Sequence, residues 1–394
     1  MSRWIYRRRV VSILLIAAVC AGFAGCDSAL YKTFHAFVFD TELSLEVWYR
    51  GRGADAAFAE MTGYMEELAR AVNRNDPDSG VSRFNGAAAG ERVEADGLLF
   101  DMTAAAIGYY EETGGAYDVS LGAINALWHT DALGLAQYGA GRGQPDGLPG
   151  GEEIAAALAV CGLARAADAA DAYDRRHFAL TESDGKKFLT KKTDGFTLDF
   201  NGMAKGYAAD VLRGIAQKHG AASAYINVAG EIAFFGKRFD GNLDTPWAVA
   251  IDNPKPGGGL SICGFTTDRP GLATSGGYRR YYPYAYPADG AVVECCHISD
   301  GRVGLPAGIT GSAGAWRNDP GRVVSATALA DSAMRADAYA TALCVMSFEE
   351  GIAFLKTADV EALLFTDDGR LAVRGAFSFA PDFTLYQAYE RVTV

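Results

Sequence analysis

The sequence has 394 residues, of which 49% are hydrophobic and 21% charged, so it is not a disordered chain and can bury a sizeable core. Its 36 basic and 48 acidic residues give a net charge of −12, which argues against nucleic acid as the principal partner. The seven cysteines form no C-x-x-C pair and the five histidines are scattered, which argues against a zinc site.

The N-terminus resembles the export signal of a bacterial lipoprotein. Four arginines precede an uncharged run from Val10 to Gly25, and the run closes with Phe23-Ala24-Gly25-Cys26, which is similar to a lipobox. This implies that Cys26 is acylated and becomes the first residue of the mature protein. An uncleaved anchor helix is the alternative, but sixteen residues are short for a membrane span. We expect a signal peptide over 1–25, a tether over 26–36, and an exported protein lipid-anchored to a bacterial cell membrane.

Periodicity predicts the elements of the first half of the chain. Residues 37–48 alternate in their second half, as a strand does. Helical spacing of apolar residues predicts helices over 54–72, 98–113 and, after a glycine-rich loop, 151–163. Residues 178–181 and 187–191 predict a hairpin around Ser183-Asp184-Gly185.

The second half of the chain continues with strands and two helices. Strands are expected over residues 196–200, 223–228, 232–235 and 247–251, and as a terminal pair within 360–373. Helices are expected over about 203–219 and 332–346, with a glycine-rich loop at 304–321. Because strands and helices mix without regular βαβ alternation, the sequence predicts an α+β fold with mostly antiparallel sheets packed with helices. Nothing between 37 and 394 is typical of a domain linker.

Five cysteines lie beyond the export signal, an odd number that cannot form a complete disulfide framework. They are Cys161, Cys263, Cys295, Cys296 and Cys344. A disulfide between the adjacent pair would be strained. We therefore expect buried free thiols.

A first candidate site lies where the strand over 196–200 runs into Asn201-Gly202 and a helix begins. A helix N-terminus offers free N–H groups that suit a phosphate, and Lys205 in the first turn adds a positive charge. The G-x-x-x-x-G-K-[ST] spacing of a P-loop is absent. A surface lysine at an ordinary strand–helix join is the alternative.

A second candidate site is the segment from Leu272 to Tyr282. Thr274-Ser275-Gly276-Gly277 can present hydroxyls and bare backbone to an anion. Tyr278, Tyr281 and Tyr282 are placed to stack on a ring. A hairpin turn with strand tyrosines is the alternative.

A third candidate is the pair His297 and Asp300, three residues apart beside Gly301. A histidine with a carboxylate in reach can act as a general base near neutral pH. The alternative is a histidine at a strand end, capped by a turn aspartate.

A fourth candidate is the pair Asp337 and Thr341, which share one face of a helix at i, i+4 spacing. Hard oxygen ligands without histidine suit Mg²⁺, with a carbonyl, waters or substrate phosphates completing the site. The alternative is a salt bridge from Asp337 to a basic residue. Together the four segments suit a nucleotide diphosphate handled with Mg²⁺.

In chain order these segments resemble the FAD:protein FMN transferase family, also called ApbE, from about Phe39 to Gly375. Further segments carry the resemblance: Ser79-Gly-Val-Ser-Arg-Phe-Asn85, Thr113-Gly-Gly-Ala-Tyr-Asp118, Asn227-Val-Ala-Gly-Glu-Ile232 and Trp247-Ala-Val-Ala-Ile251. No single one of these motifs is specific to the family. Their occurrence in the family's order along one chain is specific to it. The resemblance implies a T-fold-like ApbE domain over 37–394, and members are often lipoproteins.

The resemblance also implies the chemistry. A threonine or serine hydroxyl of an acceptor flavoprotein attacks Mg²⁺-bound FAD at the phosphate nearer the flavin, so FMN becomes linked to the acceptor and AMP leaves. Some members hydrolyse FAD to FMN and AMP instead. The family suggests flavoprotein subunits of sodium-pumping or Rnf-type redox complexes, or other exported flavoproteins, as acceptors.

The resemblance assigns roles to residues. Mg²⁺ is expected to be held by Asp337, Thr341 and the carbonyl of Gly202. Catalysis is expected from His297 and Asp300, which would deprotonate the acceptor hydroxyl, and from Lys205, which would neutralise phosphate charge. The residues expected to contact FAD are Thr41, Asp118, Lys205, Asp210, Glu231, Thr274, Ser275, Gly276 and Tyr278.

Four positions depart from the family pattern. Phe39-Asp40-Thr41 stands for Met-Gly-Thr, Ala229-Gly230-Glu231 for Gly-Gly-Asp, Gly277 for the aspartate of Ser-Gly-Asp-Tyr, and Gly301 for a proline. The loss of the aspartate at Gly277 and of the proline at Gly301 leaves Asp337, Thr341 and Lys205 unchanged, so metal and nucleotide binding are still expected. These two departures concern whether the protein transfers FMN or hydrolyses FAD. We expect the 304–321 loop to shape acceptor access.

Other functions agree with the same residues. An FAD pyrophosphatase would release AMP without a protein acceptor, and a non-catalytic lipoprotein would store or deliver FAD. A solute-binding lipoprotein would be expected to have two lobes and a hinge, and the sequence has no such break.

Overall fold

The computed structural model describes residues 30–38, 41–49, 53–139, 142–169, 171–237, 247–252, 254, 260–265, 269–375, 377–379 and 389–394. The expected export signal, Cys26, Phe39 and Asp40 lie outside these ranges. Within them, no helix combines the length and apolarity needed to cross a membrane.

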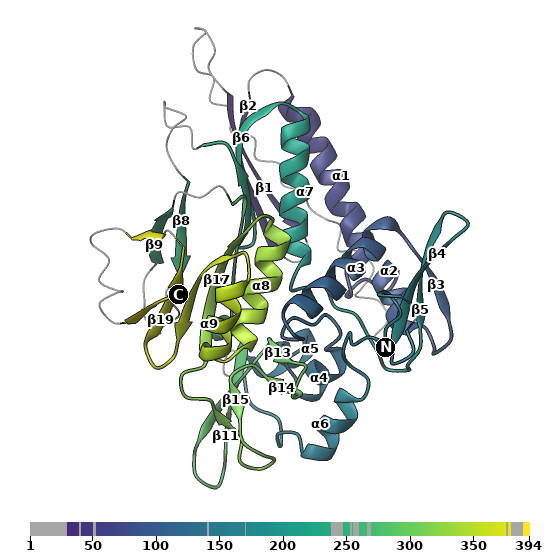
Figure 1. Cartoon of the computed structure of the whole chain (residues 1–394), viewed down its shortest axis with the longest axis vertical. Coiled ribbons are helices and arrows are strands. Elements are labelled where there is room, and N and C mark those ends of the chain that lie inside the picture. The colour runs from purple at the N-terminus through teal and green to yellow at the C-terminus, as the bar shows by residue number, and fades with distance from the viewer. Residues whose placement is uncertain are drawn as a thin grey trace.

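A nine-stranded sheet forms the centre of the molecule (Figure 1). In spatial order its strands are β1 (Leu30–Val38), β2 (Thr41–Tyr49), β6 (Ala221–Val228), β7 (Glu231–Phe235), β10 (Gly271–Gly276), β17 (Val323–Ala330), β18 (Glu361–Thr366), β19 (Arg370–Arg374) and β21 (Glu390–Thr393). Neighbouring strands run antiparallel except β19 and β21, which are parallel. The predicted α+β class with mostly antiparallel sheets is therefore confirmed.

The first strand corrects the expected tether. Leu30 pairs with Tyr49 and Val38 with Thr41, so β1 and β2 form a continuous antiparallel hairpin. Backbone hydrogen bonds tie the chain to the sheet from Leu30 onward, so a tether extending to residue 36 is wrong.

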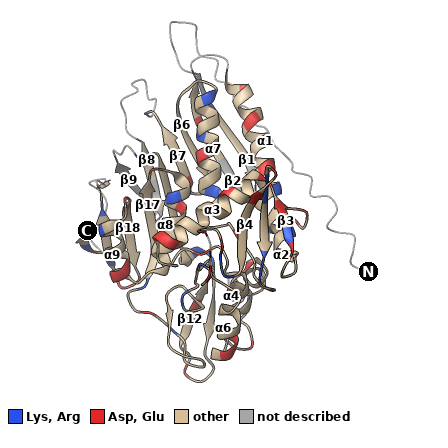
Figure 2. Cartoon of the chain, turned by 45° about the vertical axis from the view of Figure 1, so that its right-hand side comes forward, with Lys and Arg blue, Asp and Glu red and all other residues tan. Residues whose placement is uncertain are grey.

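Helices lie on one side of the central sheet and share a hydrophobic core with it (Figure 1). They are α1 (Ala54–Val72), α2 (Gly80–Gly86), α3 (Gly97–Glu112), α7 (Ala204–Lys218), α8 (Ala333–Val345) and α9 (Phe348–Thr357). On α1 the predicted apolar stripe is buried, with Met61, Met65 and Leu68 at most 2% exposed. Helix α7 carries both basic and acidic side chains along its length (Figure 2).

The opposite face of the sheet has its own core. A three-stranded sheet of β8 (Ala248–Asp252), β9 (Leu260–Phe265) and β20 (Phe377–Phe379) lies beside it. Trp247, Val249 and Ile251 pack there against Ile232 and Leu272 of the central sheet.

A third core builds a lobe at the lower end of Figure 1. Its elements are α4 (Gly122–Leu127), α5 (Ala132–Tyr138), α6 (Gly151–Leu158), β11 (Tyr281–Ala285), β12 (Val292–Cys296), β13 (Ser299–Asp300), β14 (Leu305–Pro306), β15 (Ile309–Thr310) and β16 (Arg317–Asn318). The expected 304–321 loop thus contains three two-residue strands, and it contributes Trp316, whose indole lies 5.7 Å from that of Trp128. A separate sheet of β3 (Arg92–Ala95), β4 (Phe178–Ser183) and β5 (Lys186–Lys191) contains the predicted hairpin.

Three predicted elements differ from the structure. The strand predicted over 37–48 is divided between the end of β1 and β2, which pair with each other. Residues 196–200 form no strand, and the backbone of Leu198 bonds to the side chain of Asn85: its Oδ1 accepts from Leu198 N (2.8 Å) and its Nδ2 donates to Leu198 O (2.9 Å). The helix predicted over 151–163 ends at Leu158. Of the five cysteines, Cys161, Cys295, Cys296 and Cys344 are free and buried, as predicted, and the side chain of Cys263 is outside the described set.

Candidate active site

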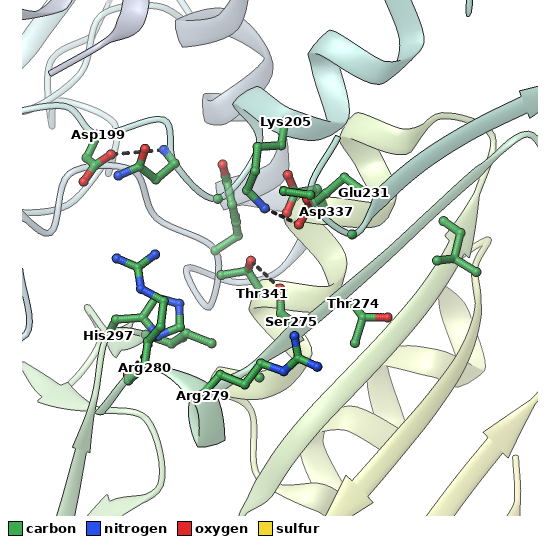
Figure 3. A pocket seen from close by; sticks show the side chains of 18 of the residues that line it. Asp199, Lys205, Glu231, Thr274, Ser275, Arg279, Arg280, His297, Asp337 and Thr341 are labelled. Atoms are coloured by element: carbon green, nitrogen blue, oxygen red, sulfur yellow. Dashed lines mark hydrogen bonds and ion pairs between the residues drawn. The ribbon is translucent and has the colours of Figure 1, made fainter. Parts of the chain in front are cut away.

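A cavity of about 570 Å³ lies where the three cores meet (Figure 3). Its walls come from the start of α7, the β6–β7 turn, β10, the η2 turn (Gly277–Arg279), the end of β12 and α8. Eleven of the expected site residues line it: Asp118, Gly202, Lys205, Glu231, Thr274, Ser275, Gly276, Tyr278, His297, Asp337 and Thr341. Segments far apart in the chain therefore form one site.

The three expected metal ligands lie together. Asp337 is 2% exposed and lies one turn before Thr341 on α8, and its Oδ2 accepts a hydrogen bond from Gly206 N (3.2 Å). A Cβ placed on Gly202 would lie 3.5 Å from Thr341 Oγ1, so the Gly202 backbone is directly beside that hydroxyl. Thr341 Oγ1 is also 3.1 Å from Ser275 Oγ.

This donor set fits Mg²⁺. Asp337 supplies a carboxylate, and burial raises its pKa although the charge of Lys205 opposes the shift. Such a carboxylate gains from a cation beside it. No group of three or more His, Cys, Asp or Glu residues in the described ranges is arranged to hold a metal. Because Mg²⁺ prefers six oxygen ligands, a cation held by the three groups of Asp337, Thr341 and Gly202 would leave coordination positions for water or phosphate oxygens.

Lys205 and Glu231 form an ion pair inside the cavity. The Lys205 ammonium, in the first turn of α7, donates to Glu231 Oε1, and Glu231 is 3% exposed. Burial acts to lower the pKa of Lys205, but the charges of Glu231 and Asp337 outweigh it and raise that pKa, so the ammonium stays charged. Burial also raises the pKa of Glu231, whose second oxygen is buried without a partner in the described residues. Lys205 is therefore a cavity residue and not a surface lysine.

The imidazole of His297 is held by a backbone carbonyl. The carbonyl oxygen of Arg280 accepts from His297 N (3.0 Å) and lies 3.2 Å from His297 Nδ1. Because a carbonyl only accepts, Nδ1 carries the proton and Nε2 keeps its lone pair. Burial, with a contribution from the charge of Arg280, lowers the pKa of His297 to about 4. A neutral imidazole with a free Nε2 can take a proton from a hydroxyl.

Asp300 does not pair with His297, which corrects the expected His/Asp arrangement. Its carboxylate accepts three hydrogen bonds from Arg302, through N (2.8 Å), Nε (2.9 Å) and Nη2 (2.8 Å). Ser299, two residues after His297, lines the cavity and Asp300 does not.

Asp210 also lies outside the cavity. Its carboxylate accepts hydrogen bonds from Ala333 N (3.0 Å) and Met334 N (2.9 Å) and so caps the start of α8. Five residues rotate the direction of a helical side chain by about 140°, which turns Asp210 away from the face that carries Lys205.

The Thr274–Tyr282 segment divides between two environments. Residues through Gly276 belong to β10, a strand inside the central sheet and not a hairpin turn. Tyr278 lines the cavity, whereas Tyr282 is buried in the third core and donates to Trp128 O (2.7 Å). Tyr281 also lies outside the cavity, so the expected stack of three tyrosines reduces to one.

Asp118 and Thr41 complete the expected set. Asp118 faces the cavity, and its Oδ1 accepts from Ser120 N (2.7 Å) and Oγ (2.6 Å). Burial raises the pKa of Asp118 to about 6, against the effect of these hydrogen bonds. The side chain of Thr41 is not among those described, so its contact with FAD stays a prediction.

Other cavity residues were not predicted. Arg279 and Arg280 lie within the Leu272–Tyr282 segment that was singled out, but no role was predicted for them; their adjacent positive charges were the available signal. An apolar wall is formed by Tyr225, Ile232, Val249, Ile251 and Leu272. Ile232 pairs with Leu272 across β7 and β10, and such pairing is not visible in a single sequence.

Comparisons with known proteins agree with this arrangement. Residues 39–364 match the model of the ApbE family. The FAD:protein FMN transferase of Klebsiella pneumoniae (strain 342) is 25% identical over 363 residues, covering 90% of this chain and 92% of the relative. That of Vibrio cholerae is 29% identical over 318 residues, covering 79% and 80%.

Solved structures show the same fold. The apo form of the flavinyl transferase ApbE of Pseudomonas stutzeri has a TM-score of 0.67 at 23% identity, covering 91% of this chain and 97% of that one. The flavin transferase ApbE of Vibrio cholerae has a TM-score of 0.65 at 24% identity, covering 92% and 100%. With the family model matched over most of its length, the chain belongs to the ApbE family.

Proposed function

We propose that this protein is an Mg²⁺-dependent FAD:protein FMN transferase. It moves FMN from FAD to a threonine or serine hydroxyl of an acceptor flavoprotein and releases AMP. The observation that carries the proposal is one cavity that combines an oxygen donor set, a charged lysine and a neutral histidine. Similarity to relatives that are named FAD:protein FMN transferases supports it.

The chain's own residues have distinct tasks in this reaction. Asp337, Thr341 and Gly202 would hold Mg²⁺, which when bound neutralises negative charge on the diphosphate. Lys205 adds a second positive charge at the start of α7. His297 Nε2 receives the proton of the acceptor hydroxyl, while the carbonyl of Arg280 fixes the ring orientation. The walls position the two reactants for in-line attack.

The direct test is a transfer assay with the full-length protein in detergent, FAD, Mg²⁺ and a test protein with a family-type acceptor threonine. The intact mass of the acceptor and the released AMP are measured together. We expect the acceptor to gain the mass of one FMN residue for each AMP released. AMP and free FMN with an unmodified acceptor would identify an FAD pyrophosphatase instead, and bound FAD without AMP a non-catalytic binder.

We also propose that the protein is exported and anchored by lipid on Cys26, on the basis of the N-terminal sequence. Cys26→Ser should abolish the incorporation of labelled fatty acid into the protein, because the thiol that would be acylated is lost. Labelling retained in the variant would contradict lipid anchoring on Cys26. Cys161→Ser is the matched control, because that thiol is buried in the folded domain.

A further inference from the structure

A cation that pairs with no acidic side chain of the described residues faces the candidate active site. Arg280 lies between the η2 turn and β11, and its side chain lines the cavity beside the ring of His297 (Figure 3). In the described ranges, its guanidinium forms no hydrogen bond and no ion pair. Lys205, by contrast, already pairs with Glu231.

The charge of Arg280 acts across the cavity. It opposes protonation of both Lys205 and His297, so the guanidinium is within electrostatic range of each. Two cations that face the same space repel one another, and an anion placed between them removes that cost. The charge of Lys205 is offset by Glu231 and Asp337, which leaves the charge of Arg280 available to a ligand.

We propose that the guanidinium of Arg280 binds the diphosphate of FAD and stabilises the charge that develops on it during transfer. The inference rests on the proposed function and adds a substrate-binding residue to it. A guanidinium presents paired N–H donors that match two phosphate oxygens, which a lysine cannot reproduce.

The transfer step shows where this charge is needed. The acceptor oxygen forms a bond to the phosphorus nearer the flavin, and the bond from that phosphorus to the bridging oxygen breaks. The bond's electron pair stays on the phosphate of the departing AMP, and the hydroxyl proton goes to His297 Nε2. Negative charge therefore grows on phosphate oxygens next to the histidine, where Arg280 lies.

The test compares Arg280→Met and Arg280→Lys with the wild-type protein, all as full-length chains. The Kd values for FAD and for riboflavin are measured by flavin fluorescence without metal, and transfer is measured separately with Mg²⁺. We expect Arg280→Met to weaken FAD binding about 10- to 100-fold, the usual effect of losing a hydrogen bond to a charged group. Riboflavin has no phosphate, so its Kd should not change. Arg280→Lys should recover only part of the loss.

Arg92→Met is the matched control. Arg92 lies on β3, with its guanidinium 3.5 Å from the centre of the Phe188 ring, and it does not line the cavity. This variant should keep wild-type FAD binding and transfer.

The outcomes separate the two proposals. Equal losses for FAD and riboflavin, or no loss for FAD, would overturn the role of Arg280. A wild-type protein that binds FAD but transfers nothing would overturn the proposed function, while the FAD-against-riboflavin comparison would still decide on Arg280. A wild-type protein that binds no FAD would overturn both.

Discussion

At the scale of single residues, the state of His297 is fixed by its neighbours. The carbonyl of Arg280 holds the Nδ1 proton, and burial together with the Arg280 charge keeps the ring neutral. The expected carboxylate partner is absent because Asp300 is engaged by Arg302. Neutral Nε2 is thus available without a prior change of protonation at physiological pH.

The titration of His297 can be measured directly. Its imidazole NMR resonances should titrate with a midpoint near 4, well below the ordinary value. In Arg280→Met the midpoint should rise, because one of the three causes of the depression, beside burial and the charge of Lys205, is removed. A wild-type midpoint above 6, or a fall in the variant, would contradict this account of the site.

The same depression predicts how stability depends on pH. The pKa of His297 is about 4 in the folded protein and about 6.5 in the unfolded chain, so below pH 6.5 the unfolded chain binds a proton that the folded ring does not. The contribution of this group is complete above pH 6.5 and is lost as the pH falls to 4. His297→Gln should therefore lose less stability than wild type over this window, by roughly 1 kcal/mol in denaturant unfolding. Parallel losses in the two proteins would be evidence against it.

Ala229 is held in an unfavourable backbone conformation. It forms the two-residue β6–β7 turn with Gly230, and its φ is +55°, in the left-handed region that favours glycine. Ala229→Gly should raise the free energy of unfolding by about 0.5–1 kcal/mol, because the relief of strain exceeds the added flexibility of the unfolded chain. Ala155→Gly, at an exposed position in α6, should lower it by about 1 kcal/mol. A loss of stability in Ala229→Gly would contradict the reading of this turn.

Residue type and spacing predicted part of the site. Asp337 and Thr341 were found because i, i+4 spacing on a helix fixes a shared face. Asp300 was paired with His297 because the two are three residues apart, and Asp210 was assigned by motif membership. Neither signal says toward which side a carboxylate points. Arg280 was missed because only the fold brings it opposite Lys205.

At the scale of elements, the site depends on the close approach of α7 and α8. A Cβ on Gly206 would lie 2.3 Å from the carbonyl oxygen of Ala333, so only glycine allows this distance. The contact brings Gly206 N within 3.2 Å of Asp337 Oδ2. The same contact therefore packs the two helices together and orients Asp337, the expected metal ligand.

Gly206→Ala should separate the two helices. We expect a loss of about 1–3 kcal/mol in the free energy of unfolding, typical of overpacking, and a weaker Mg²⁺ affinity by calorimetry. Gly214→Ala in the same helix is the control: a Cβ there meets nothing within 4 Å, so stability should rise by about 0.5–1 kcal/mol. If Gly206→Ala lowers the free energy of unfolding but leaves the Mg²⁺ affinity unchanged, metal binding does not depend on the packing of α7 against α8. That result would contradict the proposed connection between the two.

Long periodic elements were predictable and short ones were not. The apolar stripe on α1 predicted both ends of that helix correctly, because a helix of 19 residues repeats the apolar spacing over several turns. The short helices α2, α4 and α5, each of six or seven residues, lack enough turns to give a pattern. The stretch 196–200 is not the predicted strand, and the backbone of Leu198 bonds to Asn85, which lies more than 100 residues away in the sequence.

At the scale of the whole molecule, the cavity is shared by three hydrophobic cores. Tyr117 belongs to the first, Ile232 and Leu272 to the second, and Leu121 to the third, and all four line the cavity. Sequence order alone does not say which cores meet. A ligand that touches all three walls links them, so its binding energy adds to the stability of the whole protein.

Ligand binding should therefore be visible in unfolding. With Mg²⁺ present and FAD at 100 times its Kd, a substrate-bound protein gains about 2.7 kcal/mol of stability, measurable as a higher Tm. To avoid hydrolysis of FAD during the thermal scan, ADP replaces FAD as a diphosphate ligand that has no flavin to transfer. Asp337→Asn keeps an acceptor for Gly206 N but loses the carboxylate, so Mg²⁺ should no longer increase the Tm shift. If Mg²⁺ increases the shift equally in this variant, the cation is held elsewhere, and the donor set on α8 is not the metal site.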